Sequence, residues 1–530
     1  MARETWESLL GSRYTLLAAM ASLLSPASPA HGQASFDPAT ASVGQLDLAL
    51  DRGALTSEQL VRLSLARIKA FDPTLNAMLA ISPNALAEAR ALDVERRAKG
   101  PRSPLHGIPI LVKDNIDTKD MPTTLGFYAF KGAFPYADAA VVARLRAAGA
   151  IILGKTNLSE LASGPPMSSM GGQTRNPHAL AYSPAGSSNG TAVGVAAGYA
   201  PMGLATDTTG SARWPAATNG VVGIRPTIGA ISYAGIQPNA PTLDTVGAIS
   251  RHVEDASLLL AMVEGKTPPK LDPDALRGAR IGFPRADFSG DDAAVDAAMA
   301  AALAALKARG AVVVDVELPS GLIDLSDHLQ AVIVQTESRP SLDRYLSNAF
   351  PPRFPRSHSE VAALSQKLLN TPVVGATPNP GRLSGYKWEA AGPPLTDAGY
   401  QAARDQGRQY LRAALRSIFL TQRLDALVYP TQTMRINRIG EDPRRDTRGR
   451  FGNFGPVLAS LAGWPDISVP AGKTADGLPF GLSFLGQENS DDRLLNYAYS
   501  LQRQVGAPRL PVAAPELPGE HAGPQQETER

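Results

Sequence analysis

The sequence predicts an α/β protein built around a large, mostly buried β-sheet. Patterns typical of helices and of strands alternate along much of the chain, as expected for that fold class. Of the 530 residues, 44% are hydrophobic and only 19% are charged, so the chain can bury a large core. Residues 185–226 are rich in Gly, Ser and Ala, and they also contain apolar residues throughout. We therefore interpret it as packed structure and not as a flexible linker.

The expected elements follow from residue periodicity and from signals at their ends. Thr56 and Gln59 have the spacing of a capping box, so a helix is expected to begin there. Further helices are expected at 84–99, 139–148 and 291–309, and strands at 107–112, 150–153, 203–205, 311–316 and 424–428. We assign residues 35–505 to a single domain. Within it, residues 317–455 are predicted to be rich in loops and to shape the substrate cleft, and residues 506–530 are predicted to be disordered.

Composition excludes several classes of function. The net charge is only +2 and the basic residues form no cluster, so we expect no nucleic-acid partner. The chain has no cysteine, which excludes disulfides, thiolate metal ligands and a cysteine nucleophile. Its seven histidines show no HExxH-type spacing, so a metal-dependent hydrolase has little support.

The N-terminus has the pattern of an export signal. Arg13 precedes an apolar run over residues 14–24, and small residues follow, with plausible cleavage after Ala30 or Ala34. The run is too short to span a bilayer comfortably as a helix. We therefore expect residues 1–34 to be a signal peptide, and the mature chain to be periplasmic or secreted without membrane insertion.

One motif suggests nucleotide binding and is misleading. Gly149–Thr156 matches the phosphate-loop pattern GxxxxGK[ST]. In a phosphate loop the intervening residues form a turn of backbone N–H donors after a strand. Here they are Ala-Ile-Ile-Leu, which is the pattern of a strand itself, so we predict no nucleotide site.

A serine and a lysine are the strongest candidates for chemistry. Ser211 ends a Thr-Thr-Gly-Ser turn after the strand at 203–205, where backbone N–H groups can converge on an oxyanion. A serine needs a base to take its proton, but the nearest histidines in the sequence are His106 and His178. The GxSxG elbow of the α/β-hydrolases is also absent.

Lys113 is the candidate base. It directly follows the strand at 107–112, and burial would make a lysine neutral near pH 7. The residues alone leave open a second interpretation, in which Lys113 is a surface lysine beside Asp114.

Several motifs in one order resemble the amidase signature family. A Gly-Ser-Ser turn at 186–188 precedes a Thr-Asp-x-x-Gly-Ser turn at 206–211, and Ser187 and Ser211 are 24 residues apart, as in that family. The other matching segments are GIPILVKDN (107–115), LGKTN (153–157), TRNP (174–177), VVGIRPT (221–227) and GWPDISVPAG (463–472). The similarity covers most of residues 40–505 and is weakest between about 317 and 450.

The resemblance implies an amidase signature fold, in which a large mixed β-sheet is covered on both faces by α-helices. It also implies a Ser–cis-Ser–Lys triad and no metal or organic cofactor. Ser211 would be the acylated nucleophile, Ser187 the bridging serine with a cis peptide bond, and Lys113 the final proton acceptor. The residues expected to bind the oxyanion or substrate, together with the N–H of Ser211, are Thr208, Thr209, Gly210 and Ser188.

Four nearby positions have less certain roles. Thr209 stands where the family commonly has glycine, and we expect an ordinary backbone conformation there. Asp207 is expected either to order the oxyanion loop or to be a plain turn carboxylate. For Arg213 a structural salt bridge is favoured over pairing with a substrate carboxylate, and Trp214 either lines the acyl pocket or packs in the core.

The function implied is an exported amidase that hydrolyses the C–N bond of a small or aryl amide. One alternative is a carbamate or ester hydrolase with the same triad. Another is an amidotransferase subunit that passes ammonia to an aminoacyl-tRNA, and the export signal and the absence of a basic patch count against it. An inactive binding protein is disfavoured because all three triad positions are filled. The expected partner is a small-molecule amide, and dimers are common among similar proteins.

Overall fold

The computed structural model describes residues 36–442, 444–445, 449, 452 and 454–520. The expected signal peptide, residues 1–34, lies outside the described residues. A compact unit begins at Phe36. Among the described residues, no helix combines the length and apolarity needed to cross a membrane.

The core is a mixed sheet of 11 strands, in the order β1-β3-β2-β6-β8-β7-β12-β13-β11-β9-β10. Neighbouring strands β3, β2 and β6 are parallel, as are β11, β9 and β10, whereas the pairs between β6 and β11 are antiparallel. The strands of this sheet are β1 (Met78–Ile81), β2 (Pro109–Lys113), β3 (Ile151–Thr156), β6 (Met202–Asp207), β7 (Val222–Arg225), β8 (Thr245–Ser250), β9 (Arg280–Phe283), β10 (Val312–Asp315), β11 (Ala426–Pro430), β12 (Asp466–Lys473) and β13 (Pro479–Leu485). A separate hairpin pairs β4 (Met167–Ser168) with β5 (Gly172–Gln173).

Helices cover both faces of the sheet, as expected. Alternate residues of a strand point to opposite faces, and in β2 Ile110 and Val112 belong to one apolar cluster while Leu111 belongs to another. The first cluster includes residues of α1 (Val43–Asp51), α4 (Ala140–Ala147), α7 (Val253–Glu264), α9 (Ala293–Ala308) and α16 (Asp491–Val505). The second includes residues of α2 (Ser57–Leu75), α3 (Ala85–Lys99), α5 (Asn189–Ala196) and α6 (Arg213–Thr218).

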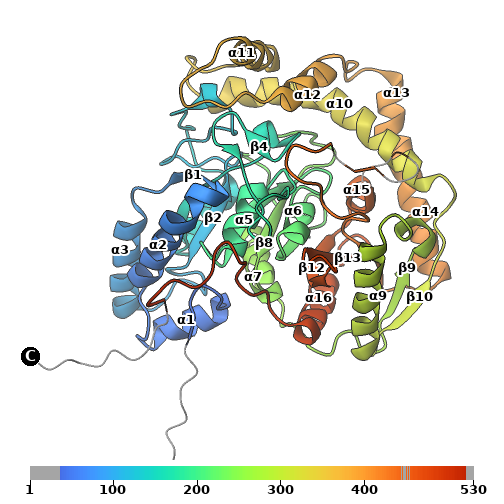
Figure 1. Cartoon of the computed structure of the whole chain (residues 1–530), viewed down its shortest axis with the longest axis horizontal. Coiled ribbons are helices and arrows are strands. Elements are labelled where there is room, and N and C mark those ends of the chain that lie inside the picture. The colour runs from blue at the N-terminus through green and yellow to red at the C-terminus, as the bar shows by residue number, and fades with distance from the viewer. Residues whose placement is uncertain (1–35, 443, 446–448, 450–451, 453, 521–530) are drawn as a thin grey trace, which may run out of the picture. The chain divides into compact units, whose positions relative to one another are not determined.

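Residues 317–455 were expected to be rich in loops. This expectation is wrong for residues 322–421 but holds for the described residues of 431–453, which form no helix or strand. Most of residues 322–421 form a helical layer, whose first members lie together at the top of Figure 1. The frequent prolines of this region lie mostly between helices, and Pro340 is accommodated inside a helix of 28 residues. The helices are α10 (Leu322–Ala349), α11 (His358–Asn370), α12 (Pro380–Ala390), α13 (Ala398–Gln401), a π-helical turn at Ala402–Gly407, and α14 (Arg408–Thr421). The remaining helices of the chain are α8 (Arg285–Phe288) and α15 (Phe454–Ala462), with short turns at Tyr128–Phe130 and Glu160–Ala162.

The predicted disordered tail differs from the structure over residues 506–520. This segment packs across α2, seen in dark red beside α2 in Figure 1. Arg67 of α2 is completely buried and donates to both carboxylate oxygens of Glu520, at 2.6 and 2.8 Å. It also donates to the carbonyl oxygens of Ala514 and Pro515. Burying an arginine requires such partners, and this requirement orders a segment that its composition suggests is disordered.

Glu520→Gln is expected to lower the free energy of unfolding by about 1–3 kcal/mol, because it removes the charge that Arg67 faces in the interior. The carbonyl partners of Arg67 limit the loss to that range. Urea denaturation of the purified protein measures it. Val512→Ala is the matched control in the same segment, since Val512 is 82% exposed and should change stability very little. Equal losses in the two variants would contradict the role given to Glu520.

Candidate active site

The predicted catalytic residues come from adjacent parts of the sheet. Lys113 is the last residue of β2, and Ser211 follows β6, the parallel neighbour of β2. The carboxyl ends of parallel strands lie at the same edge of a sheet. Ser187 lies in the turn that leads into α5, which packs on the same strands.

Lys113 is buried, so the interpretation of a surface lysine beside Asp114 is wrong. Its Nζ donates to Ser187 Oγ at 2.7 Å and to Thr206 Oγ1 at 2.8 Å. Burial lowers the pKa of Lys113 to about 7, although the carboxylates of Asp207 and Asp244 act to raise it. A substantial fraction of Lys113 is therefore neutral near pH 7 and can accept a proton.

Ser187 follows the only cis peptide bond found in the described residues, Gly186–Ser187, as the resemblance implied. Its side chain is buried, and its carbonyl oxygen accepts from the Ser159 N–H at 3.0 Å. A Cβ at position 186 would lie 2.4 Å from Ser159 Oγ, so this close approach requires glycine.

Ser211 is half-buried, and a backbone hydrogen bond links it to Ser188, the residue that follows the expected bridging serine. The Ser188 N–H donates to the Ser211 carbonyl oxygen at 3.1 Å. Among the described residues, no hydrogen bond joins the hydroxyls of Ser187 and Ser211. In enzymes without bound substrate such bonds are often long and tighten only in the complex.

The oxyanion loop is ordered by Asp207, which settles the role of that residue. One carboxylate oxygen of Asp207 accepts from the Gly210 N–H at 2.9 Å and the other from the Ala212 N–H at 3.1 Å. Gly210 has φ +121°, which favours glycine, whereas Thr209 avoids positive φ, as expected. The Gly210 N–H, which was expected to bind the oxyanion, donates to Asp207 in this structure, so its role toward an oxyanion stays a prediction. The N–H groups of Thr209 and Ser211 have no acceptor among the described residues.

Arg213 forms a structural salt bridge, as favoured from the sequence. It donates to Asp207 at 2.9 and 3.0 Å and to Asp466 at 2.8 Å, and all three side chains are buried. Arg225 also contacts Asp207, at 3.2 Å. Burial acts to raise the pKa of Asp207, but the two guanidinium groups outweigh it and hold that pKa well below its usual range. Asp207 is therefore a fixed negative charge under the oxyanion loop.

Ser188 was expected among the residues that bind the oxyanion or substrate, and that role stays a prediction. Its side chain is buried, and its hydroxyl donates to the Thr206 carbonyl oxygen at 3.3 Å. What it contributes is the backbone bond to Ser211.

Ser188→Ala is therefore expected to keep kcat within about threefold of the wild type, because it removes one long neutral hydrogen bond. Ser187→Ala is expected to lower kcat by roughly 10²–10⁴-fold, because it removes the residue expected to relay a proton to Lys113, the expected base. Steady-state assays of both variants measure this contrast. Equal losses would contradict the assignment of Ser187, and not Ser188, to the relay.

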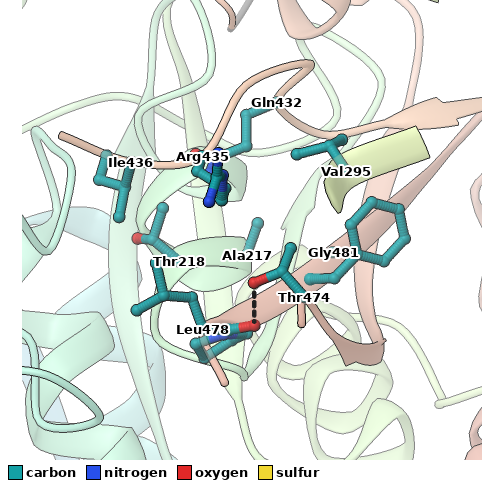
Figure 2. Close-up of a pocket in the computed structure, with 11 residues that line it drawn as sticks. Ala217, Thr218, Val295, Gln432, Arg435, Ile436, Thr474, Leu478 and Gly481 are labelled. Carbon is teal, nitrogen blue, oxygen red and sulfur yellow. Dashed lines mark hydrogen bonds between the residues drawn. The ribbon is translucent and has the colours of Figure 1, made fainter. Parts of the chain in front are cut away.

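Trp214 packs between the oxyanion loop and the segment after β11. Its backbone N–H donates to the Gly210 carbonyl oxygen at 2.8 Å, and its indole N–H donates to Gln432 Oε1 at 2.7 Å. Gln432 lines the pocket in Figure 2, together with Thr218 at the far end of α6. None of the predicted triad residues lines this pocket, so it lies apart from the candidate active site.

The apparent phosphate loop is a strand, as predicted. Its lysine, Lys155, lies in β3 and forms a buried ion pair with Asp114 at 3.1 Å. Lys155 also donates to Thr123 Oγ1 at 2.7 Å. The charge of Lys155 is therefore balanced by Asp114, the residue next to Lys113.

Two residues at the site were missed in the sequence. Thr206 accepts from both Lys113 and Asn115, at 2.8 and 3.2 Å. Asp244 accepts from Thr208 Oγ1 at 2.7 Å, and burial raises the pKa of Asp244 to about 6. Thr206 opens the Thr-Asp motif and was therefore within reach of sequence reasoning, whereas Asp244 is 33 residues beyond Ser211 and only pairing of β6 with β8 brings it close.

The site thus brings Ser187 and Ser211 close to the buried Lys113 at one edge of a mixed sheet that helices cover. The model of the Amidase family matches residues 59–495. The protein belongs to the amidase family, and it is an enzyme of the class that hydrolyses C–N bonds other than peptide bonds.

Named relatives and solved structures support this family. The A-type subunit of glutamyl-tRNA(Gln) amidotransferase from Anaeromyxobacter sp. (strain K) is 36% identical over 485 residues, which is 88% of this chain and 95% of that protein. Peptide amidase of Stenotrophomonas maltophilia is 36% identical with a TM-score of 0.78, covering 89% of this chain and 98% of that one. The structure of the A-type amidotransferase subunit from Thermotoga maritima is 26% identical with a TM-score of 0.69, covering 90% of this chain and all of that one (100%).

Proposed function

We propose that this enzyme hydrolyses a small or aryl carboxylic amide to the acid and ammonia or an amine, through an acyl-enzyme on Ser211. The observation that carries the proposal is the buried Lys113, 2.7 Å from Ser187 Oγ and with a pKa of about 7. Among the described residues, Lys113 forms no ion pair with a carboxylate, and a general base must be neutral to accept a proton.

The proposed reaction begins with two proton transfers. Ser187 Oγ gives its proton to neutral Lys113 Nζ and takes the proton of Ser211 Oγ. Ser211 Oγ then forms a bond to the amide carbon, and the carbonyl oxygen becomes an oxyanion. The N–H groups of Thr209 and Ser211 have no acceptor among the described residues and can bind it.

Collapse of this intermediate breaks the C–N bond. The proton held on Lys113 returns through Ser187 to the leaving nitrogen, which departs as ammonia or an amine. A water molecule then attacks the ester carbon, gives its proton to the relay and releases the acid, and Ser211 recovers its hydroxyl proton. Atoms and charges balance without a metal or an organic cofactor.

A second candidate function is that of an A-type amidotransferase subunit. Curated relatives of that name are 34–36% identical, and the matches cover 94–97% of their length. The amidase proposal is supported by the peptide amidase structure, whose TM-score of 0.78 and identity of 36% exceed the 0.69 and 26% of the Thermotoga maritima structure. Both candidates place the same amide chemistry on Ser211.

Export separates the two candidates, and we propose that residues 1–34 direct the chain out of the cytoplasm. The support is the Arg13 and apolar-run pattern. Expression of the full chain in a Gram-negative host, with fractionation and N-terminal sequencing, tests it. A periplasmic chain beginning at His31 or Ser35 supports export, and an intact Met1 chain in the cytoplasm overturns it.

The test of the activity is a hydrolysis panel on residues 35–530. Ammonia release is scored with primary amides, including peptide amides, and amine release with anilides and carbamates. We expect amide turnover that Ser211→Ala abolishes. Adding Ala212→Ser to that variant, which places a serine one position away, is not expected to restore the turnover. Turnover of carbamates or esters alone would favour the alternative substrate class, and activity unchanged in Ser211→Ala would overturn the proposed function.

A further inference from the structure

The segment that follows β3, residues 157–162, forms a backbone hydrogen bond with Ser187. The Ser159 N–H donates to the Ser187 carbonyl oxygen at 3.0 Å. Ser159 Oγ is buried without a hydrogen-bond partner among the described residues, and a Cβ at Gly186 would lie 2.4 Å from it. Any shift of Ser159 therefore moves the peptide that carries the Ser187 hydroxyl.

The backbone just beyond Ser159 is held in an unfavourable conformation. Leu161 and Ala162 have φ of +50° and +56°, although neither is glycine. Such residues persist only where their surroundings fix them, and they are common near functional sites. One restraint comes from the segment after β2, because the Leu161 N–H donates to the Leu125 carbonyl oxygen at 2.8 Å.

The other restraints come through Glu160, and they reach into the helical layer. The Glu160 carboxylate accepts from the Ser169 N–H at 2.7 Å and from the Tyr386 hydroxyl at 2.9 Å. Arg382 Nε donates to the Glu160 carbonyl oxygen at 3.0 Å. Tyr386 and Arg382 both belong to α12, so this helix donates hydrogen bonds to both the carboxylate and the backbone carbonyl of Glu160.

The position of Arg382 in α12 is fixed by further buried hydrogen bonds. Arg382 donates to both oxygens of Glu389, at 2.7 and 3.1 Å, and Glu389 bonds His358 Nε2 at 2.9 Å. All these side chains are buried. The chain of contacts thus runs from α11 through α12 and Glu160 to Ser187.

We propose that Glu160 and Tyr386 are positioning residues for the serine–lysine relay. They act through the Ser159–Ser187 backbone bond and tie the relay to the helical layer. This inference rests on the proposed function, and it adds to that function a control of relay geometry by α12, a helix that begins 193 residues beyond Ser187. Misplacement of a catalytic group by about 1 Å can cost 10²-fold in rate.

The test uses Tyr386→Phe, which removes one hydroxyl, and Glu160→Gln, which keeps the side-chain shape. The matched control is Tyr400→Phe. Tyr400 is also a buried tyrosine of the helical layer that donates to a glutamate, Glu337, at 2.7 Å, but Glu337 bonds Thr242 and not the 159–162 segment.

The first readout is the rate at which a fluorophosphonate labels Ser211, followed by intact mass and peptide mapping. The Ser211 oxygen forms a bond to phosphorus, fluoride leaves, and the proton passes to the relay, so the rate reports relay geometry without a known substrate. We expect labelling to slow by roughly 10- to 100-fold in Tyr386→Phe and Glu160→Gln, and by less than about twofold in Tyr400→Phe. With a substrate from the panel, kcat should fall in the same proportion while KM stays within about twofold, because the binding surface is untouched.

Three results would overturn the proposal. Labelling within twofold of the wild type in both Tyr386→Phe and Glu160→Gln shows that the contacts do not position the relay. Equal losses in Tyr386→Phe and Tyr400→Phe show a general packing effect, and melting temperatures measured alongside identify it. A wild-type protein that is not labelled at Ser211 overturns the proposed function itself, and the positioning role with it.

Discussion

Lys113→Met lowers kcat/KM for amide hydrolysis by about 10²–10⁴-fold, the range expected on loss of a general base. Methionine is close to lysine in length and suits the buried position, so the fold is expected to survive. What is lost is the only group within hydrogen-bond distance of Ser187 Oγ, among the described residues, that can take its proton. Steady-state kinetics on purified variants measure the effect, with circular dichroism as the check on folding.

The pH dependence of the wild type follows from the same residue. Burial lowers the pKa of Lys113 to about 7, so the inactive ammonium form dominates below that pH and the active amine form above it. The logarithm of kcat/KM should therefore rise with pH below about 7 and level off above it. The residual activity of Lys113→Met should lack this rise. A wild-type profile that is flat across pH 7 would contradict Lys113 as the base.

Asp207→Asn is expected to lower the free energy of unfolding by about 3–5 kcal/mol, the cost of leaving buried charges without a partner. Asp207 faces Arg213 and Arg225, and all three side chains are fully buried. An asparagine would also turn an N–H donor toward these donors or toward the N–H groups of the oxyanion loop. Urea denaturation followed by fluorescence measures the change.

Asp315→Asn is the matched control for this prediction. Asp315 also pairs with an arginine, Arg285, at 2.9 Å, but the two side chains are 58% and 53% exposed. Surface pairs of this kind contribute about 0–1 kcal/mol. Comparable losses in the two variants would show that the buried network contributes no more than a surface pair.

Local motifs were sufficient to predict which residues meet at the candidate site. The turns around Ser187 and Ser211, and the strand ending at Lys113, each carry their own signals, and the sheet brings Lys113 and Ser187 into contact. The capping box at Thr56 and Gln59 is present in the structure for the same reason, because it depends on residues three apart.

The helical layer could not be predicted because its signals conflict. Pro340 inside α10 suggests a break that the structure does not contain. Two helix starts were nonetheless readable. Ser357 accepts from the Glu360 N–H, and Asn379 caps α12 with Pro380 at its first position.

Side-chain partners within the site were beyond local reasoning. Whether the Gly210 N–H is free depends on the direction of the Asp207 carboxylate, and the position of that carboxylate depends on Arg213 and Arg225. The grip of Tyr386 on Glu160 joins residues 226 apart. Neither contact leaves a pattern in sequence spacing.

The contact between Arg67 and Glu520 has a consequence for biosynthesis. These residues are 453 positions apart, and Arg67 is fully buried only when the end of the chain covers it. At a synthesis rate of about 5–20 residues per second, roughly 20–90 seconds pass between the synthesis of Arg67 and that of Glu520. The N-terminal helices therefore cannot reach their final packing during translation. A chain that delays its own closure in this way is still incompletely folded when its synthesis ends, which is compatible with the export proposed above.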